Sequence, residues 1–84
     1  MSNVNAPMGP AGAHYLVTPD DGNDLPNGEC AALWIGGAGD VCLIDAAGLS
    51  VTFTGVPAGT YLLSRAKRVK ATLTTATNII ALYP

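Results

Sequence analysis

Three short apolar runs in the middle of the chain are separated by glycine-rich joints. The runs are Ala31–Ile35, Val41–Ile44 and Leu49–Thr54. Short β-branched or aromatic runs, with turn signals about every ten residues, are typical of an antiparallel β-meander. Glycine supplies the positive φ angles that tight hairpin turns require. This stretch therefore predicts three strands that pair in sequence order.

Side-chain alternation within these runs indicates which residues are buried. Val51 and Phe53 are expected to face inward, with threonines between them facing outward. The run Ala31–Ile35 is apolar on both faces, and a strand of this kind is usually buried on both. We expect one face of it to meet the second sheet and the other to meet a neighbouring subunit. The predicted core residues are Leu33, Trp34, Ile35, Val51, Phe53 and Val69.

The flanking segments extend this pattern to an all-β domain. Residues 1–13 lack periodicity and predict a flexible or extended N-terminal arm, followed by a single domain over residues 14–84. Its further predicted strands are His14–Thr18, Tyr61–Arg65, Lys67–Thr74 and Asn78–Tyr83. The predicted fold is a small antiparallel β-sandwich, jelly-roll-like, of about seven short strands, with its second sheet running from Lys67 to Tyr83.

One segment also fits a different element. Leu62, Ala66, Val69 and Leu73 recur with a helical period, so an amphipathic helix over residues 60–73 is an alternative to two strands. Against the helix, the basic residues would crowd at its start, where the dipole disfavours them. The sequence leaves both interpretations open.

The composition indicates a protein that needs partners. The chain has 84 residues, of which 49% are hydrophobic and only 12% charged, against about 25% charged in typical soluble domains. So small a domain buries only about 60% of the surface that its unfolded chain exposes. Copies of the chain or another protein are therefore expected to cover part of the apolar surface.

The charges are segregated along the sequence. All six acidic residues lie in the first 45 positions, and the four bases lie within Arg65–Lys70. This arrangement suits complementary surfaces in a closed ring, and it equally suits pairing within one chain. The predicted subunit-interface residues are Asp20, Asp21, Asp24, Arg65, Arg68 and Lys70.

The net charge of −2 gives no general attraction to nucleic acid or to an acidic membrane. On a strand the basic residues alternate between two faces, so they form no single stripe that could follow a phosphate backbone. We expect neither nucleic acid nor membrane as a partner.

Reactive side chains are too few and too scattered to predict an active site. Cys30 and Cys42 are about three residues out of register if their strands form a hairpin, so we expect two free, buried cysteines in a reduced compartment. With the single His14 they do not make a zinc site. The N-terminal segment has no signal-peptide pattern. The sequence therefore predicts a cytoplasmically made protein with no catalysis, no metal and no cofactor.

Several short motifs occur in a fixed order over about residues 15–83. They are Val17-Thr18-Pro19-Asp20-Asp21, Leu25-Pro26, Ala32–Val41, Val51–Thr60, Lys67-Arg68-Val69, Ala71-Thr72, Thr74–Thr77 and Ile79–Tyr83. In this order they resemble one protein family, the head-spike base proteins of alphaproteobacterial gene transfer agents and related tailed phages. Two positions depart from the family pattern: Leu73 stands where a glycine is expected, and Tyr61–Ser64 lacks a proline.

The resemblance implies a structural virion protein at the five-fold vertices of the head. There a homopentameric base would dock on the major capsid protein and carry a spike or fibre that attaches the particle to host-surface polysaccharide. It also implies a small β-sandwich without catalysis or cofactor, located on the virion head surface after assembly in the host cytoplasm. Two alternatives stay open: a capsid decoration or cement protein, and a small carbohydrate-binding module of a phage spike that uses exposed Trp34 or Tyr61.

Overall fold

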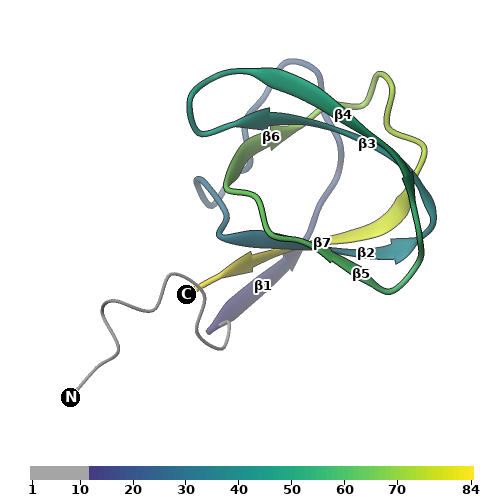
Figure 1. Cartoon of the computed structure of the whole chain (residues 1–84). Coiled ribbons are helices and arrows are strands. Elements are labelled where there is room, and N and C mark those ends of the chain that lie inside the picture. The colour runs from purple at the N-terminus through teal and green to yellow at the C-terminus, as the bar shows by residue number, and fades with distance from the viewer. Residues whose placement is uncertain (1–11) are drawn as a thin grey trace.

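A computed structural model describes residues 12–84, which form a two-layer β-sandwich (Figure 1). The strands are β1 (Ala13–Leu16), β2 (Ala32–Gly37), β3 (Gly39–Asp45), β4 (Ser50–Val56), β5 (Thr60–Leu62), β6 (Ala66–Val69) and β7 (Thr77–Tyr83). Sheet A has the order β1-β7-β2-β5 and sheet B the order β4-β3-β6, and every pairing is antiparallel. The prediction of an all-β sandwich with about seven short strands is confirmed.

The N-terminal arm predicted for residues 1–13 lies mostly outside the described residues, and Ala13 already belongs to β1. The helix considered for residues 60–73 is wrong, because β5 and β6 occupy this segment. Within residues 12–84, no helix is long and apolar enough to span a membrane.

The predicted meander is wrong in its first strand pair, β2 with β3. Strands β2 and β3 do not pair with each other: β2 lies between β7 and β5, whereas β3 lies between β4 and β6. The glycine-rich joint between them carries the chain from sheet A to sheet B. The predicted second sheet from Lys67 to Tyr83 is also wrong, because β6 joins sheet B and β7 joins sheet A. Sequence-adjacent strands were expected to pair, but here the strongest apolar runs are divided between two layers.

The strand order is that of a jelly roll with one strand replaced. Jelly rolls contain eight strands in two sheets, and here an irregular segment after β1 takes the remaining place, beside β6. Its Asp20, Leu25 and Cys30 N–H groups donate to the carbonyl oxygens of Val69, Lys67 and Ala66 at 2.9, 2.8 and 2.9 Å. The segment thereby covers the outer edge of β6, which would otherwise be open to pairing with another chain.

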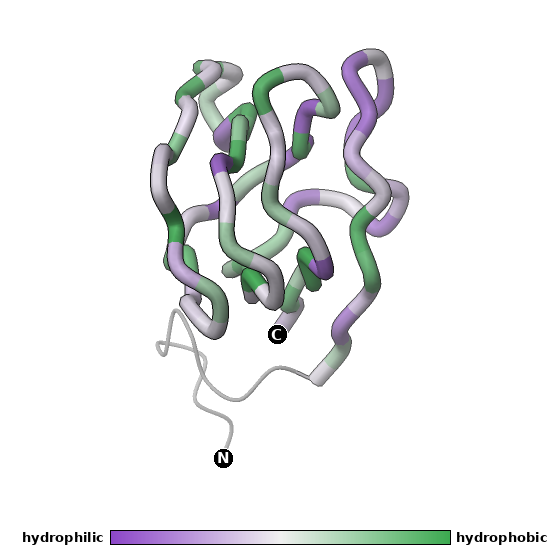
Figure 2. Tube along the Cα trace, turned by 90° about the vertical axis from the view of Figure 1, so that its right-hand side faces the viewer, coloured by the Kyte–Doolittle hydropathy of each residue, from purple (hydrophilic) through white to green (hydrophobic). Residues whose placement is uncertain are grey.

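The core lies between the two sheets. Sheet A contributes Leu33 and Ile35, and sheet B contributes Leu43 and Val69; all four are at most 2% exposed. Phe53 is partly buried against this cluster. Figure 2 shows hydrophobic segments within the strands and a mostly hydrophilic stretch in the loop that follows β1.

Two predicted core residues lie elsewhere. Trp34 alternates with Leu33 and Ile35, so its side chain is on the outer face of sheet A and is only half-buried. Val51 is opposite Leu43 and has the predicted inward parity, yet it is 52% exposed. The physical reason is that β4 is an edge strand of sheet B, so its side chains have a neighbouring strand on one side only.

The two cysteines are free and buried. The hairpin register from which this was predicted does not exist, since β2 and β3 belong to different sheets. Cys30 is part of the core, and burial raises the pKa of its thiol. Cys42 is on sheet B, with its sulfur 3.5 Å from the Ser50 hydroxyl. Burial keeps the Cys30 thiol neutral, and a neutral thiol is a poor nucleophile.

Candidate functional site

The outer face of sheet A carries apolar side chains on all four strands. Cross-strand pairing places Tyr61, Trp34, Ile80 and Leu16 in one row, from β5 through β2 and β7 to β1. Directly opposed residues of antiparallel strands have side chains on the same face. A second row contains Ala32, Leu82 and His14. Together these seven residues define the outer face of sheet A.

Large side chains on this face are open to solvent. Leu16 is 70% exposed and Tyr61 57% exposed, and Leu63, one residue beyond β5, is 78% exposed. The Trp34 and Tyr61 rings pack edge to face, with centroids 4.8 Å apart and planes at 63°. Contiguous apolar surface of this kind usually marks an interaction site.

Charge is absent from the same strands. The sequences of β1, β2, β5 and β7 contain no Lys, Arg, Asp or Glu. The acidic residues lie in the loop after β1 and in β3, and the basic residues lie in or beside β6. Depletion of charge distinguishes the centre of protein interfaces from ordinary protein surface. The outer face of sheet A has this property across its whole width.

Two of the six predicted interface charges, Arg68 and Asp24, pair with each other within one chain. Arg68 forms an ion pair with Asp24, in which Nε and one terminal nitrogen each lie 2.8 Å from the carboxylate. Its other terminal nitrogen donates to the Asp21 carbonyl oxygen at 3.0 Å. Arg65 pairs with Glu29. The structure thus holds the loop after β1 on β6, and pairing of these charges between subunits stays a prediction.

Asp20 and Asp21 stabilise loops through hydrogen bonds. The Asp20 carboxylate accepts the N–H groups of Gly22 and Asn23 at 2.7 and 3.1 Å. The Asp21 carboxylate accepts the N–H and hydroxyl of Thr72 at 2.9 and 2.6 Å, joining two loops distant in sequence. Hydrogen bonds to a carboxylate favour its charged form. They lower the pKa of Asp20, mainly through Gly22, and that of Asp21, mainly through the Thr72 hydroxyl.

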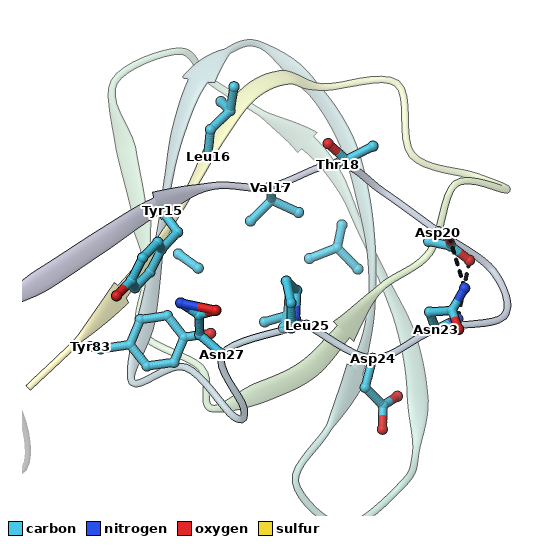
Figure 3. A pocket seen from close by; sticks show the side chains of 13 residues that line it. Tyr15, Leu16, Val17, Thr18, Asp20, Asn23, Asp24, Leu25, Asn27 and Tyr83 are labelled. Carbon is cyan, nitrogen blue, oxygen red and sulfur yellow. Dashed lines mark hydrogen bonds between the residues drawn. The ribbon is translucent and has the colours of Figure 1, made fainter.

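A cavity of about 300 Å³ opens between β1 and the loop that follows it (Figure 3). Tyr15 and Tyr83 form one wall, with ring centroids 5.6 Å apart in an edge-to-face arrangement. Val17, Leu25 and Val69 contribute apolar surface. Figure 3 shows Leu16 pointing away from the cavity, toward the outer face of sheet A. The cavity exists because an irregular segment, in place of a full strand, closes this side of the sandwich.

The cavity is suited to holding an apolar group rather than to catalysis. The Tyr83 hydroxyl donates to the Gly28 carbonyl oxygen at 2.7 Å, and burial raises the pKa of Tyr83. Asp20 and Asn23 line one end of the cavity, but their side chains form a hydrogen bond with each other. Among residues 12–84, no group of three or more His, Cys, Asp or Glu side chains could hold a metal ion.

Sequence reasoning did not identify this cavity or the full outer face. Alternation along β1 places Tyr15 and Val17 on one face and Leu16 on the other, and this signal is visible in the sequence. Strand β1 pairs with β7, and this pairing brings the β1 residues next to Ile80 and Tyr83. It is a contact between the two ends of the domain. No local sequence pattern predicts the pairing of β1 with β7.

Comparison with known proteins gives a structural relative. No protein-family model matches the chain, and a search of curated proteins finds no match. Among solved structures, the chain is similar to a chain of the "Capsid of native GTA particle computed with C5 symmetry". The two share 42% sequence identity and superimpose with a TM-score of 0.79, over 87% of this chain and 83% of that chain.

Proposed function

The chain belongs to the family of this gene transfer agent (GTA) capsid chain, and we propose that it is a structural virion protein that forms the base of a head spike at the five-fold vertices of a capsid. In this role a homopentamer joins the major capsid protein to a spike or fibre used in attachment to the host surface. The observation that carries the proposal is the relationship itself: 42% identity over 87% of the chain, with the same fold.

The symmetry of the related particle supports the vertex position. Its capsid was computed with C5 symmetry, an operation that repeats a chain five times around one axis. Motifs of the head-spike base family occur in the same order along this chain, from Val17 to Tyr83. A pentameric base fits both observations.

The surface chemistry supports a structural role. The most distinctive surface of the described residues is the uncharged outer face of sheet A, and permanent assemblies have more hydrophobic interfaces than transient complexes. The small cavity beside β1 has apolar walls and suits a buried side chain better than a reaction. These features favour an assembly component.

Localisation in purified particles tests the proposal. Particles made by a host carrying a tagged copy of the chain should show the tag at the capsid vertices in cryo-electron microscopy, below a projecting spike. Deleting the gene should remove the spike but leave closed capsids. Tag density spread over the capsid faces would favour the decoration or cement alternative.

The carbohydrate-binding alternative is supported by one observation, the exposure of Tyr61 beside Trp34. Binding of the isolated protein to a glycan array, lost in Trp34→Ala while the protein stays folded, would establish it. The edge-to-face packing of the two rings favours the structural role, because two rings in one plane would offer a sugar a broader platform.

A further inference from the structure

Asn27 and Gly28 form the only asparagine–glycine pair of the chain. They are the last two residues of a turn in which the Gly28 N–H donates to the Leu25 carbonyl oxygen at 3.1 Å. Asparagine is a chemically labile residue, because the backbone nitrogen of the next residue can attack its side-chain amide. Glycine in the next position hinders this attack least, since it has no Cβ. The pair is therefore where such an attack is easiest in this sequence.

The surroundings of the pair leave room for the reaction. Both residues are exposed, and a Cβ built on Gly28 would meet no atom within 4 Å. The hydrogen bond that holds the Gly28 nitrogen lies in a surface loop, where local opening requires little free energy. The turn can therefore open far enough for the Gly28 nitrogen to reach the Asn27 amide.

The other two asparagines of residues 12–84 are less accessible to this chemistry. The Asn23 side chain donates a hydrogen bond to the Asp20 carboxylate at 3.2 Å. Asn78 lies within β7 and precedes Ile79, which is 2% exposed and has a bulky, β-branched side chain. Neither residue is followed by glycine.

Asp21 is also followed by a glycine, and an aspartate can form the same ring with loss of water. Here both reacting groups are held in other contacts. The Asp21 carboxylate accepts the N–H and the hydroxyl of Thr72 at 2.9 and 2.6 Å. The Gly22 N–H donates to the Asp20 carboxylate at 2.7 Å. The structure thus distinguishes two sequence pairs of similar intrinsic reactivity.

We propose that Asn27 is a site of spontaneous deamidation. The Gly28 nitrogen, having lost its proton to the solvent, forms a bond to the Asn27 Cγ; the Cγ–Nδ2 bond breaks and the amide leaves, with a proton from water, as ammonia. Water then opens the resulting succinimide ring. Opening at Cγ leaves an aspartate, whereas opening at the backbone carbonyl carbon leaves an isoaspartyl residue. Either product carries a carboxylate in place of the neutral amide.

The isoaspartyl product changes the cavity wall at Tyr83. The Tyr83 hydroxyl donates to the Gly28 carbonyl oxygen at 2.7 Å, and this bond joins the loop to β7. In the isoaspartyl product the backbone runs through the side-chain carbon atoms, so the Gly28 carbonyl group is displaced. The new carboxylate also joins Asp20 and Asp24 in a cavity lining that contains no basic residue. Deamidation should therefore loosen the loop that closes this side of the sandwich.

Timed incubation of the full chain tests the proposal. Folded protein is kept at neutral and at mildly alkaline pH, and samples are digested at acidic pH to prevent conversion during digestion. Mass spectrometry with electron-transfer fragmentation then separates aspartyl from isoaspartyl products. We expect steady loss of the Asn27 amide, faster at the higher pH because the attack requires a deprotonated Gly28 nitrogen. Asn23, Asn78 and Asp21 should stay unmodified.

Asn27→Gln is the matched control. It keeps an amide in the turn, but its longer side chain would have to close a larger ring, which forms more slowly, so it should stay intact. Asn27→Asp supplies the new charge without the change in the backbone. Urea unfolding should show a lower midpoint for aged wild type than for fresh Asn27→Asp, and no change on ageing for Asn27→Gln.

Two results would contradict this inference. Conversion of Asn27 only in the urea-unfolded chain would overturn the modification site, because the turn would then protect the pair. Conversion in the folded protein with an unchanged unfolding midpoint would overturn the effect on the Tyr83 contact. Neither result bears on the proposed vertex role, which rests on the relationship to the capsid chain.

Discussion

At the residue scale, Leu73 shows backbone strain. Its φ is 69°, in the left-handed region, which costs a residue with a Cβ roughly 1–2 kcal/mol. The family resemblance leads us to expect a glycine at this position, and the backbone conformation gives the physical reason for that expectation.

Leu73→Gly should therefore stabilise the protein. We expect the free energy of unfolding to rise by about 1 kcal/mol, because relief of the left-handed strain exceeds the added entropy of the unfolded glycine. Chemical denaturation measures the change. Asn78, with φ of 51°, is the comparison site: Asn78→Ala should destabilise the fold, since asparagine tolerates this conformation better. A loss of stability in Leu73→Gly would contradict this explanation.

Asp21 makes stability depend on pH. Its pKa is lowered in the folded state by the Thr72 hydroxyl and N–H, so the stability it contributes is fully present above the unfolded value of about 3.9. It is lost as the pH falls through the lower folded pKa. We expect the unfolding free energy of the wild type to fall below about pH 4 and to fall less steeply in Asp21→Asn.

Thr72→Val provides the matching change on the other partner. It keeps the Asp21 carboxylate but removes its hydroxyl donor, so the pH dependence should also become shallower. Urea unfolding at a series of pH values measures all three proteins. Equal slopes would mean that the contact between these two loops does not affect the titration of Asp21.

At the element scale, the connection from β2 to β3 places these two strands in different sheets of the sandwich. The joint Gly36–Gly39 crosses from one sheet to the other while lying against the segment before β7. A Cβ at Gly39 would lie 2.6 Å from the Ala76 nitrogen and 2.8 Å from its Cα. These are backbone atoms, which cannot rotate away as a side chain can.

Gly39→Ala should be strongly destabilising. Overpacking typically costs about 1–3 kcal/mol, and the upper end of this range is expected here because the contact is with backbone. Gly55→Ala is the control: φ is 66° at this glycine, but no atom would lie within 4 Å of the new Cβ. Its cost should be only about 1 kcal/mol, from the φ angle alone. Thermal or chemical unfolding compares the two, and equal losses would show that the close approach is unimportant.

The segment between β1 and β2 acts as the missing strand of the jelly roll. Its backbone pairs irregularly with β6, and the Arg68–Asp24 pair fixes it there. An irregular segment closes the side of the sandwich less completely than a strand would, which leaves the cavity beside Tyr15 and Tyr83.

At the scale of the whole molecule, polar and apolar surfaces are separated by sheet. Sheet A presents an uncharged outer face, whereas sheet B and its loops carry the acidic and basic residues. Such a molecule can associate through one sheet and keep its charged surface in water. This separation underlies the proposed function.

Salt distinguishes two ways of assembling. Apolar contact is not weakened by screening, so the oligomer should be as stable, or more stable, in high salt than in low salt. If Asp20–Asp24 of one subunit paired with Arg65–Lys70 of the next, salt would weaken the oligomer. Sedimentation velocity at low and high sodium chloride concentration separates the two, and dissociation in high salt would favour the charge-based interface.

The sequence by itself determined most of the elements. Alternation of apolar and polar residues, together with glycine at the joints, located five of the seven strands to within two residues, because both signals are local properties of the backbone. Over residues 60–73 it left a helix open, and it extended the strand that starts at Lys67 to Thr74, whereas β6 ends at Val69. It also indicated an under-charged chain with too much apolar surface for a small monomer. The inward parity of Val51 and Phe53 follows from the same period of two.

The tertiary structure decided how the elements are combined. Pairing of β1 with β7 and separation of β2 from β3 depend on contacts between distant segments, which local patterns do not encode. For this reason the sequence placed Trp34 in the core, whereas the structure places it on the outer face of sheet A beside Tyr61. The same contacts put Arg68 against Asp24 within one chain. The apolar residues on both faces of the run Ala31–Ile35 indicate that both faces of this strand are covered in the working protein. Only the fold shows that the chain's own sheet B covers the face with Leu33 and Ile35.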